Sequence, residues 1–241
     1  MIKGIYDSAS GMLPRILKQE IYANNMANVN TPGFKKDDIF LEVLTDAVNG
    51  SSDRPWQTRM VDGIYVDFTQ GSHQRTNIDT NLALEGDGFF VVNTDQGTRY
   101  TRNGNFSVSP DGILIDGKGN PVQSDSGPMN VLGDQIVIGS DGIVSVDGST
   151  LGTIKVVDFD RPYALKKIEG TYFVPGDDAA VEKPAEEFRI RQGYLEKSNV
   201  NIVEVMVDML SSFRAYEAGQ KAIQTQDKTL EKAVNDLGRV M

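Results

Sequence analysis

Cysteine is absent from the 241-residue chain, and histidine occurs only once. The missing thiols exclude disulfides, thiol catalysis and cysteine-ligated zinc sites. The single histidine, His73, falls in an expected loop, and no Gly-x-Ser-x-Gly elbow is present to supply a serine nucleophile. These absences predict a chain without catalytic residues, and therefore a protein that is not an enzyme.

Long apolar runs are also missing, since no stretch reaches the length that crosses a bilayer. The residues after Met1 include Asp7, Ser8 and Pro14, where a Sec-type signal peptide would have an apolar core and a cleavage site. We therefore expect neither membrane insertion nor a cleaved signal peptide. Such a chain is either cytoplasmic or exported by another route.

Basic residues are outnumbered, with 24 Lys and Arg against 34 Asp and Glu, which gives a formal net charge of −10. This charge repels a phosphate backbone, so we expect no nucleic-acid partner. Residues 1–30 carry three basic and two acidic side chains, and residues 198–241 carry five basic and six acidic ones. The negative charge therefore lies in the middle of the chain, and the ends can meet other protein without strong repulsion.

Motifs that bind phosphates or metals are missing as well. The stretch at residues 86–88 lacks the third glycine of a dinucleotide fingerprint, and no Gly-Lys-Ser/Thr loop occurs. Asp-Gly pairs begin at Asp111, Asp116, Asp141 and Asp147, but without the alternating acidic ligands of a calcium loop. Hairpin turns explain these pairs better, and we predict no cofactor and no bound metal.

Residues 1–30 show the periodicity of a helix that buries one face. Gly11 and Pro14 both oppose a single straight helix, so either the helix kinks here or the main helix begins with Pro14 in its first turn. It should end near residues 28–31, because Pro32 pushes the preceding residue away from helical geometry. The apolar stripe consists of Ile2, Ile5, Ala9, Met12, Ile16, Ala23 and Met26.

The middle of the chain predicts an all-β domain of many short strands with glycine-rich turns, in a sandwich or barrel-like fold. Residues 89–101 predict a hairpin that turns at residues 95–97, and the Asn-Gly pair at 103–104 predicts a further turn with positive φ angles. Residues 109–117 resemble residues 140–148, and each copy has the pattern of a turn, a short strand and a turn.

The segment from residue 31 to residue 71 has weaker periodicity, and Asn, Gly, Ser and Asp at residues 49–53 predict a flexible loop, so we interpret the segment as a connector. The sequence thus predicts four parts. They are an N-terminal assembly helix at 1–30, the connector at 31–71, the β domain at 72–191 and a C-terminal assembly helix at 192–241.

The last forty residues give the strongest periodic signal, an apolar seam with alternating spacings of four and three. A helix from residue 202 to residue 241 would be about 60 Å long at 1.5 Å per residue, too long for the β domain to cover. The two terminal helices can pair within one chain, but the C-terminal seam is longer, and its surplus predicts an interaction surface. The seam consists of Ile202, Met206, Met209, Phe213, Tyr216, Gln220, Ile223, Asp227, Leu230, Val234, Leu237 and Met241.

Several polar and glycine residues have expected roles of their own. Asn24, Asn25 and Asn28 either bond neighbouring backbone or an adjacent subunit, or simply end the helix. Gln220 and Asp227 interrupt the C-terminal seam, and we expect them to hydrogen-bond across an assembled interface or to line a water-filled lumen. A tight turn at Pro32-Gly33 needs a positive φ angle at the glycine, and Gly86 and Gly88 are expected in turns.

Blocks spread over nearly the whole chain resemble the signatures of flagellar axial proteins, the family of rod, hook and hook-associated proteins. The blocks also follow the order that they have in this family. They are ANNMANVNTPGFK at residues 23–35, LALEGDGFF at 82–90, YTRNGNF at 100–106, QGYLEKSNVN at 192–201 and RAYE at 214–217.

This resemblance implies a structural subunit of the flagellar basal-body rod, which spans the periplasm. It implies export through the flagellar type III apparatus without a cleaved signal, and partners among the protein itself and other rod and hook proteins. The terminal helices would form a coiled-coil layer inside a helical tube that transmits torque, with the β domain outside. The chain is too short for the outer domains of a hook protein. Its connector lacks the insertion associated with the distal rod protein, which favours the proximal-rod member slightly over the distal one.

Two other functions fit parts of the sequence. In a secreted adhesin or cap-type binding module, the β domain would recognise a partner and the helices would only form oligomers. An enzyme that acts on peptidoglycan is a more distant alternative, because no pair of catalytic carboxylates supports it. Electron microscopy separates the first alternative from a rod subunit, since a rod subunit forms tubes or fibres and a binding module forms small closed oligomers.

Overall fold

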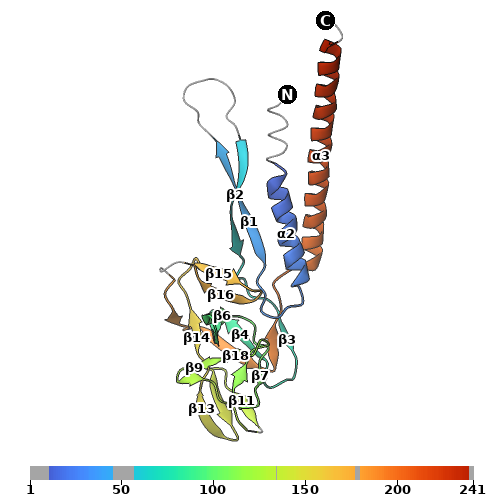
Figure 1. Cartoon of the computed structure of the whole chain (residues 1–241). Coiled ribbons are helices and arrows are strands. Elements are labelled where there is room, and N and C mark those ends of the chain that lie inside the picture. The colour runs from blue at the N-terminus through green and yellow to red at the C-terminus, as the bar shows by residue number, and fades with distance from the viewer. Residues whose placement is uncertain (1–10, 46–56, 134, 177–179, 239–241) are drawn as a thin grey trace. The chain divides into compact units, whose positions relative to one another are not determined.

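The computed structural model describes residues 11–45, 57–133, 135–176 and 180–238. The chain divides into two compact units, and each is described by itself (Figure 1). The helical unit comprises Met1–Ala27, Asp37–Asp67 and Asn201–Met241. The β unit comprises Asn28–Lys36 and Phe68–Val200. The described residues therefore form a β-rich protein of mixed α and β structure.

Within its described residues, the helical unit is built from two helices and a β-hairpin (Figure 1). Helix α2 (Leu13–Ala27) has Pro14 in its first turn, where the missing amide costs no helical hydrogen bond, so this alternative of the sequence analysis is confirmed. Helix α3 (Ile202–Gly238) begins after Asn201, whose Oδ1 accepts a hydrogen bond of 3.1 Å from the backbone N–H of Val203. No helix in the described parts of the chain is long and apolar enough to cross a membrane.

The hairpin joins β1 (Asp37–Thr45) to β2 (Gln57–Val66) in antiparallel register, from Asp37 opposite Val66 to Thr45 opposite Gln57 (Figure 1). Both strands fall in the segment that the sequence analysis interpreted as a connector. Strand β1 has apolar residues at both odd and even positions, so its sequence lacks the alternation of apolar and polar residues that predicts a strand. The loop expected at residues 49–53 lies outside the described residues.

The β unit holds a six-stranded sheet in the order β15-β16-β6-β5-β14-β17 and a three-stranded sheet in the order β11-β12-β13. Four two-stranded pairs, β4 with β18, β3 with β19, β7 with β8 and β9 with β10, complete it. The strands are β3 (His73–Arg75), β4 (Leu82–Gly86), β5 (Phe89–Thr94), β6 (Gly97–Thr101), β7 (Ser107–Val108), β8 (Leu114–Ile115), β9 (Gln123–Ser124), β10 (Gly127–Pro128), β11 (Ile136–Ile138), β12 (Ile143–Val146), β13 (Ser149–Thr153), β14 (Val156–Asp158), β15 (Leu165–Ile168), β16 (Tyr172–Pro175), β17 (Lys183–Pro184), β18 (Phe188–Gln192) and β19 (Tyr194–Glu196).

The β unit buries its own apolar core, and strands far apart in sequence contribute to it. Leu82 and Leu84 of β4, Phe90 of β5 and Val144 of β12 are completely buried in one cluster. Strand β4 also pairs with β18 over five positions, so the beginning and the end of the β unit lie side by side. This pairing brings the family-like blocks at residues 82–90 and 192–201 together.

The predicted hairpin is confirmed, because β5 and β6 pair antiparallel up to Thr94 and Gly97. The internal similarity is also confirmed: Gly112 and Gly142 have φ angles of 79° and 87°, and each N–H bonds the carbonyl three residues earlier. The expected positive φ at residues 103–104 is wrong. Gly104 is buried instead against the backbone of Leu82, where a Cβ atom would overlap the carbonyl oxygen.

The expected loop position of His73 is wrong as well, since it opens strand β3. It is partly buried, and its Nε2 lies 3.1 Å from the carbonyl oxygen of Leu84. Gly86, the last residue of β4, and Gly88, just before β5, have φ angles of 95° and 106°, as expected of turn residues.

Candidate assembly interface

One face of α3 packs against α2, and the two helices run antiparallel. Met12, just before α2, lies so close to Gly219 of α3 that its side chain would contact a Cβ atom added at this glycine. The hydroxyl of Ser212 donates a 3.2 Å hydrogen bond to the carbonyl of Arg15. Val205 and Ser212 are buried on this face. The side chains that are at least half-buried recur with alternating spacings of four and three, and they include Val205, Met209, Ser212, Tyr216, Gly219, Ile223, Gln226 and Leu230.

The seam predicted from the sequence therefore divides between two faces. Met209, Tyr216, Ile223 and Leu230 lie on the partly buried face, whereas Ile202, Met206, Phe213, Gln220 and Asp227 are exposed. Four of the exposed seam residues directly follow a residue of the face that packs against α2. They are Met206, Phe213, Gln220 and Asp227, which follow Val205, Ser212, Gly219 and Gln226. The side chains of Val234 and Leu237 lie outside the described residues.

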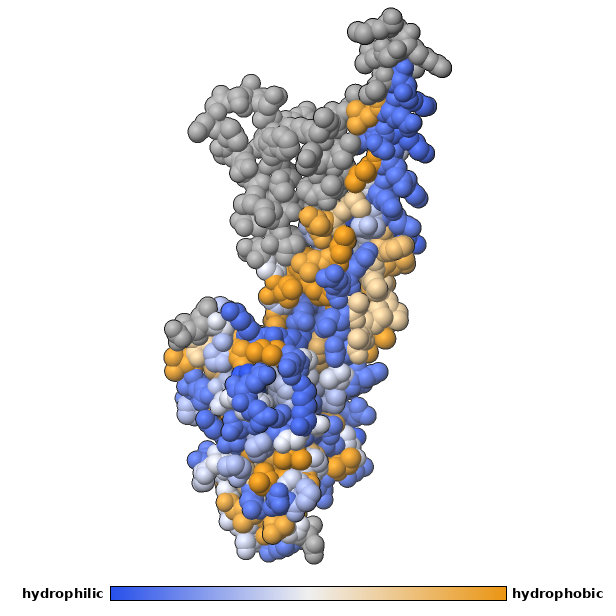
Figure 2. All heavy atoms as spheres, viewed as in Figure 1, coloured by the Kyte–Doolittle hydropathy of each residue, from blue (hydrophilic) through white to orange (hydrophobic). Residues whose placement is uncertain are grey.

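The first three turns of α3 carry an uncovered apolar surface, which we call the α3 patch. It consists of Ile202, Val203, Met206, Val207, Leu210 and Phe213. Val203 is 67% exposed, Val207 59% and Phe213 49%. In Figure 2, apolar side chains gather around the N-terminal half of α3, whereas the C-terminal half of α3 is largely hydrophilic. Gln220 and Asp227 belong to that polar half.

Helix α2 carries a narrower exposed stripe, which we call the α2 stripe. It consists of Leu13, Ile16, Glu20, Ala23 and Ala27, with alternating spacings of three and four. Leu13 is 69% exposed, and the predicted stripe members Ile16 and Ala23 are exposed too. The predicted members Met12 and Met26 are half-buried, and Ile2 and Ile5 lie outside the described residues.

A groove of about 330 Å³ lies between α2 and α3 within the helical unit. Its lining includes the charged side chains of Arg15, Lys18 and Asp208 and the phenol of Tyr22. Burial, followed by the carboxylates of Asp208 and Asp38, raises the pKa of Tyr22 above its ordinary value. The groove carries charges of both signs, from Arg15, Lys18 and Asp208.

Asn25 fixes the end of α2 to the hairpin within the helical unit. Its side chain is 2% exposed, donates a 2.7 Å hydrogen bond to the carbonyl of Asp37 and accepts a 2.9 Å bond from the N–H of the same residue. The expectation that one of these asparagines bonds neighbouring backbone is met at this position. Asn24 is exposed and Asn28 half-buried, and the carbonyl of Asn28 accepts the N–H of Thr31 where the helix ends.

The segment at residues 28–36 docks inside the β unit. Gly33 has a φ of 67°, as expected, and a Cβ atom there would overlap the backbone of Asn103. Its N–H donates a 2.8 Å bond to the carbonyl of Glu196. Phe34 is 1% exposed, and the ammonium of Lys167 lies 3.5 Å from the centre of its ring.

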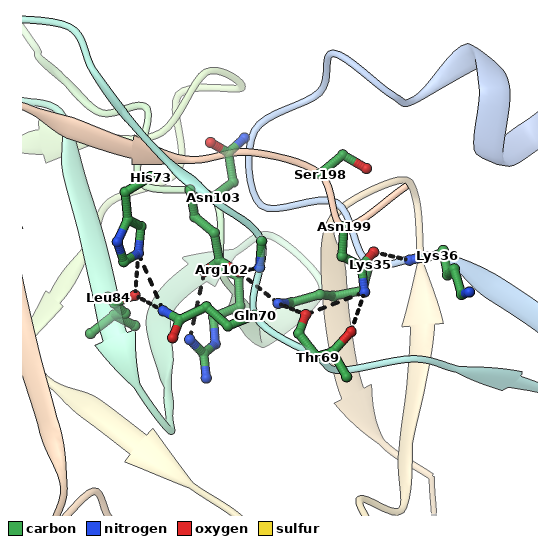
Figure 3. A network of polar contacts seen from close by, with 12 residues as sticks. Lys35, Lys36, Thr69, Gln70, His73, Leu84, Arg102, Asn103, Ser198 and Asn199 are labelled. Carbon is green, nitrogen blue, oxygen red and sulfur yellow. Dashed lines mark hydrogen bonds and ion pairs between the residues drawn. The ribbon is translucent and has the colours of Figure 1, made fainter. Parts of the chain in front are cut away.

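Lys35 occupies the centre of a buried polar cluster (Figure 3). Its ammonium donates a 2.6 Å bond to Glu196 Oε1 and a 2.8 Å bond to the carbonyl of Thr69. The same Oε1 accepts the N–H of Gly71 at 3.0 Å, and Arg102 Nη1 lies 3.6 Å from Oε2. The side chains of Lys35, Arg102 and Glu196 are only 1%, 4% and 0% exposed, so this ion cluster is shielded from water.

Asn199 closes the same cluster from the C-terminal side (Figure 3). Its Oδ1 accepts a 2.7 Å bond from the N–H of Lys36, and its Nδ2 donates to the carbonyl and hydroxyl oxygens of Thr69 at 3.2 and 3.1 Å. The family-like blocks at 23–35, 100–106 and 192–201 therefore meet at one place. No role was predicted for Lys35, Arg102 or Glu196 from the sequence, although each lies in one of these family-like blocks.

The described residues contain no group of three His, Asp or Glu side chains placed to hold a metal ion. The exposed apolar surfaces of the helical unit are suited to packing against other protein.

Three family profiles match the chain. The profile described as flagella basal body rod protein matches residues 5–35, the flagellar hook protein FlgE/F/G D1 domain matches residues 83–155, and the flagellar basal body rod FlgEFG protein C-terminal profile matches residues 191–237.

Curated relatives match over nearly their full lengths. The chain is 33% identical to flagellar basal-body rod protein FlgF of Caulobacter vibrioides, with 100% of both chains covered. It is 35% identical to FlgG of Borreliella burgdorferi, with 98% of both covered, and 32% identical to FlgF of Salmonella typhimurium, with 97% of both covered.

Proposed function

The chain belongs to the family of flagellar basal-body rod proteins and is a structural subunit of the rod, and we propose that it polymerises there through its terminal helices into a helical tube that transmits torque. One observation carries this proposal. The α3 patch is a contiguous apolar surface that α2 leaves uncovered, and exposed apolar surfaces of this kind mark protein interaction sites.

The proposal extends to how the subunit reaches its position. Export without a cleaved signal through the flagellar type III apparatus and a coiled-coil layer of terminal helices are parts of it, with other rod and hook proteins as partners. The negative net charge of the chain and the near-neutral ends support this arrangement, because the ends can pack closely while the β domain remains solvated.

We favour the proximal rod over the distal rod for this subunit. The alignments with the two FlgF relatives run over 247 and 250 positions, whereas those with the FlgG relatives of Borreliella burgdorferi and Bacillus subtilis run over 261 and 264. The longer alignments support a chain that lacks an insertion of the distal type. Sequence identity alone favours neither member.

Gold labelling of an epitope-tagged chain in purified hook-basal bodies tests this position. We expect the tag to co-purify with the basal body and the gold to lie on the rod, at its end nearer the cell body. Label at the hook end would contradict the proximal assignment and leave the rod function standing. A tagged chain that is secreted but absent from the basal body would support the alternative of an adhesin or cap-type binding module.

A further inference from the structure

Residues 33–36 and 196–199 lie side by side in the β unit, close to the points where the chain arrives from α2 and departs for α3. We call this pair of segments the clamp. Its two halves are far apart in the sequence, since Lys35 and Glu196 are 161 positions apart. The covalent path from one half to the other therefore runs through β1, β2 and most of the β unit, whereas the clamp joins the two halves directly.

The two halves of the clamp run in the same direction. The N–H of Gly33 donates a 2.8 Å hydrogen bond to the carbonyl of Glu196. Further along both segments, the N–H of Asn199 donates a 3.4 Å bond to the carbonyl of Phe34. Helix α2 precedes the first half and α3 follows the second. A force that separates the two helices would therefore pull the halves past each other in opposite directions, so that their hydrogen bonds are loaded together and none opens alone.

Side chains strengthen this contact in a place that is shielded from water (Figure 3). The 2.6 Å bond between Lys35 and Glu196 joins side chains that are 1% and 0% exposed. Asn199 accepts a 2.7 Å bond from the N–H of Lys36, and it donates to both oxygens of Thr69. Hydrogen bonds in such a low-dielectric setting are stronger than bonds that exchange with water. The clamp should therefore resist a pulling force.

Two glycines hold the clamp against neighbouring backbone. A Cβ atom at Gly33 would overlap the backbone of Asn103, and a Cβ atom at Gly71 would overlap the carbonyl of Lys197. Both halves of the clamp therefore touch other backbone directly, without a side chain in between. A contact of this kind has little room to stretch before its bonds break.

We propose that the clamp carries the tension between α2 and α3, so that a force on these helices bypasses the core of the β unit. The clamp is a device of the single chain, and it acts whether or not the chain polymerises. The bypass follows from the connectivity, because both helices are attached to the β unit at this one place. The β unit would then stay folded until the clamp breaks.

Single-molecule force spectroscopy of the full-length chain tests the clamp, because no natural cysteine competes with introduced attachment points. Ala27→Cys and Glu204→Cys, both at exposed positions, attach the handles at the end of α2 and the start of α3. The measured quantity is the rate of rupture at constant force. We expect Asn199→Ala to raise this rate about tenfold or more, because it removes three side-chain hydrogen bonds at the clamp.

Asn120→Ala, made in the same background, is the matched control. It also removes asparagine side-chain hydrogen bonds within the β unit, in this case to Asp116 and Tyr172, which lie outside the clamp. This variant should lower the resistance of the β unit to urea and leave the rupture rate unchanged. The comparison separates a loss of overall stability from a loss of strength at the clamp.

An unchanged rupture rate with Asn199→Ala, in protein that keeps its β circular dichroism, would overturn the proposal. Equal increases with Asn199→Ala and Asn120→Ala would also overturn it, because the load would then pass through the core. If Asn199→Ala failed to fold, Thr69→Val takes its place, since it removes only the 3.1 Å bond from Asn199 to the hydroxyl. We expect a smaller increase in rate from Thr69→Val, and no increase would count against the clamp in the same way.

Discussion

Replacing Phe213 by aspartate is expected to abolish incorporation of the subunit into the rod and to leave the β unit folded. Phe213 is 49% exposed within one chain, so the substitution removes little of the packing between α2 and α3. In the assembled rod, burial of this ring is worth roughly 1.5–3 kcal/mol, and an aspartate at the same place would have to lose its hydration as well. The cost recurs at every subunit, so a polymer should not form.

The measurement is the swimming of cells that carry Phe213→Asp, together with the subunit content of their purified basal bodies. Thr225→Asp introduces the same charge at an exposed position outside the α3 patch and should preserve motility. Tyr216 is a poorer choice for this test, because it lies on the face toward α2 and its loss would disturb the helical unit itself. Normal motility with Phe213→Asp would rule out the α3 patch as an assembly surface.

Replacing Glu196 by glutamine is expected to lower the free energy of unfolding of the β unit by about 3–5 kcal/mol, since the change removes the buried carboxylate that two buried cations face. Glu196 is the carboxylate that faces both Lys35 and Arg102, and all three side chains are almost completely buried. Arg102 makes the case stronger, because its Nε and Nη1 atoms have no hydrogen-bond acceptor and depend on the nearby charge.

Urea unfolding followed by circular dichroism measures this loss in the full-length chain. Asp160→Asn is the matched control, since the Lys183–Asp160 pair is largely exposed and should change stability by less than about 1 kcal/mol. Adding Lys35→Met to Glu196→Gln should recover part of the loss, because it removes one of the two buried cations that face this carboxylate. Equal effects of Glu196→Gln and Asp160→Asn would show that the buried cluster contributes no more than a surface pair.

The C-terminal helix illustrates what periodicity can and cannot predict. The periodicity indicated a helix from residue 202 onward, and α3 begins there, whereas residues 192–201, which we had assigned to the same C-terminal segment, contain strand β19. Met206 and Phe213 follow the predicted spacing, but Val205 and Ser212 follow it equally well. Val205 and Ser212 lie on the face that packs against α2 and are buried, whereas Met206 and Phe213 are exposed. Periodicity fixes that a face is apolar, but it does not say which partner covers that face.

The hairpin of β1 and β2 could not be predicted in the same way. Strand β1 has apolar residues at both odd and even positions, and its register with β2 shifts between Phe40 and Leu41, so no period of two runs through the strand. The strands of the β unit were easier to predict, because glycine turns such as those at Gly97, Gly112 and Gly142 mark their ends.

The buried cluster shows a different limit of the sequence. Lys35 and Glu196 are 161 positions apart, and no local spacing connects them. Each was visible only as part of a block that resembles a family signature. The fold supplies the missing information, because the pairing of β3 with β19 and of β4 with β18 brings the end of the β unit back to its beginning.

The central claim is that subunits polymerise through their terminal helices, and electron cryomicroscopy of the purified full-length chain at high concentration tests it most directly. We predict tubes or short helical fibres in which the α3 patch, including Phe213, is buried against a neighbouring subunit. Small closed oligomers, or fibres in which Phe213 remains exposed to solvent, would contradict the claim.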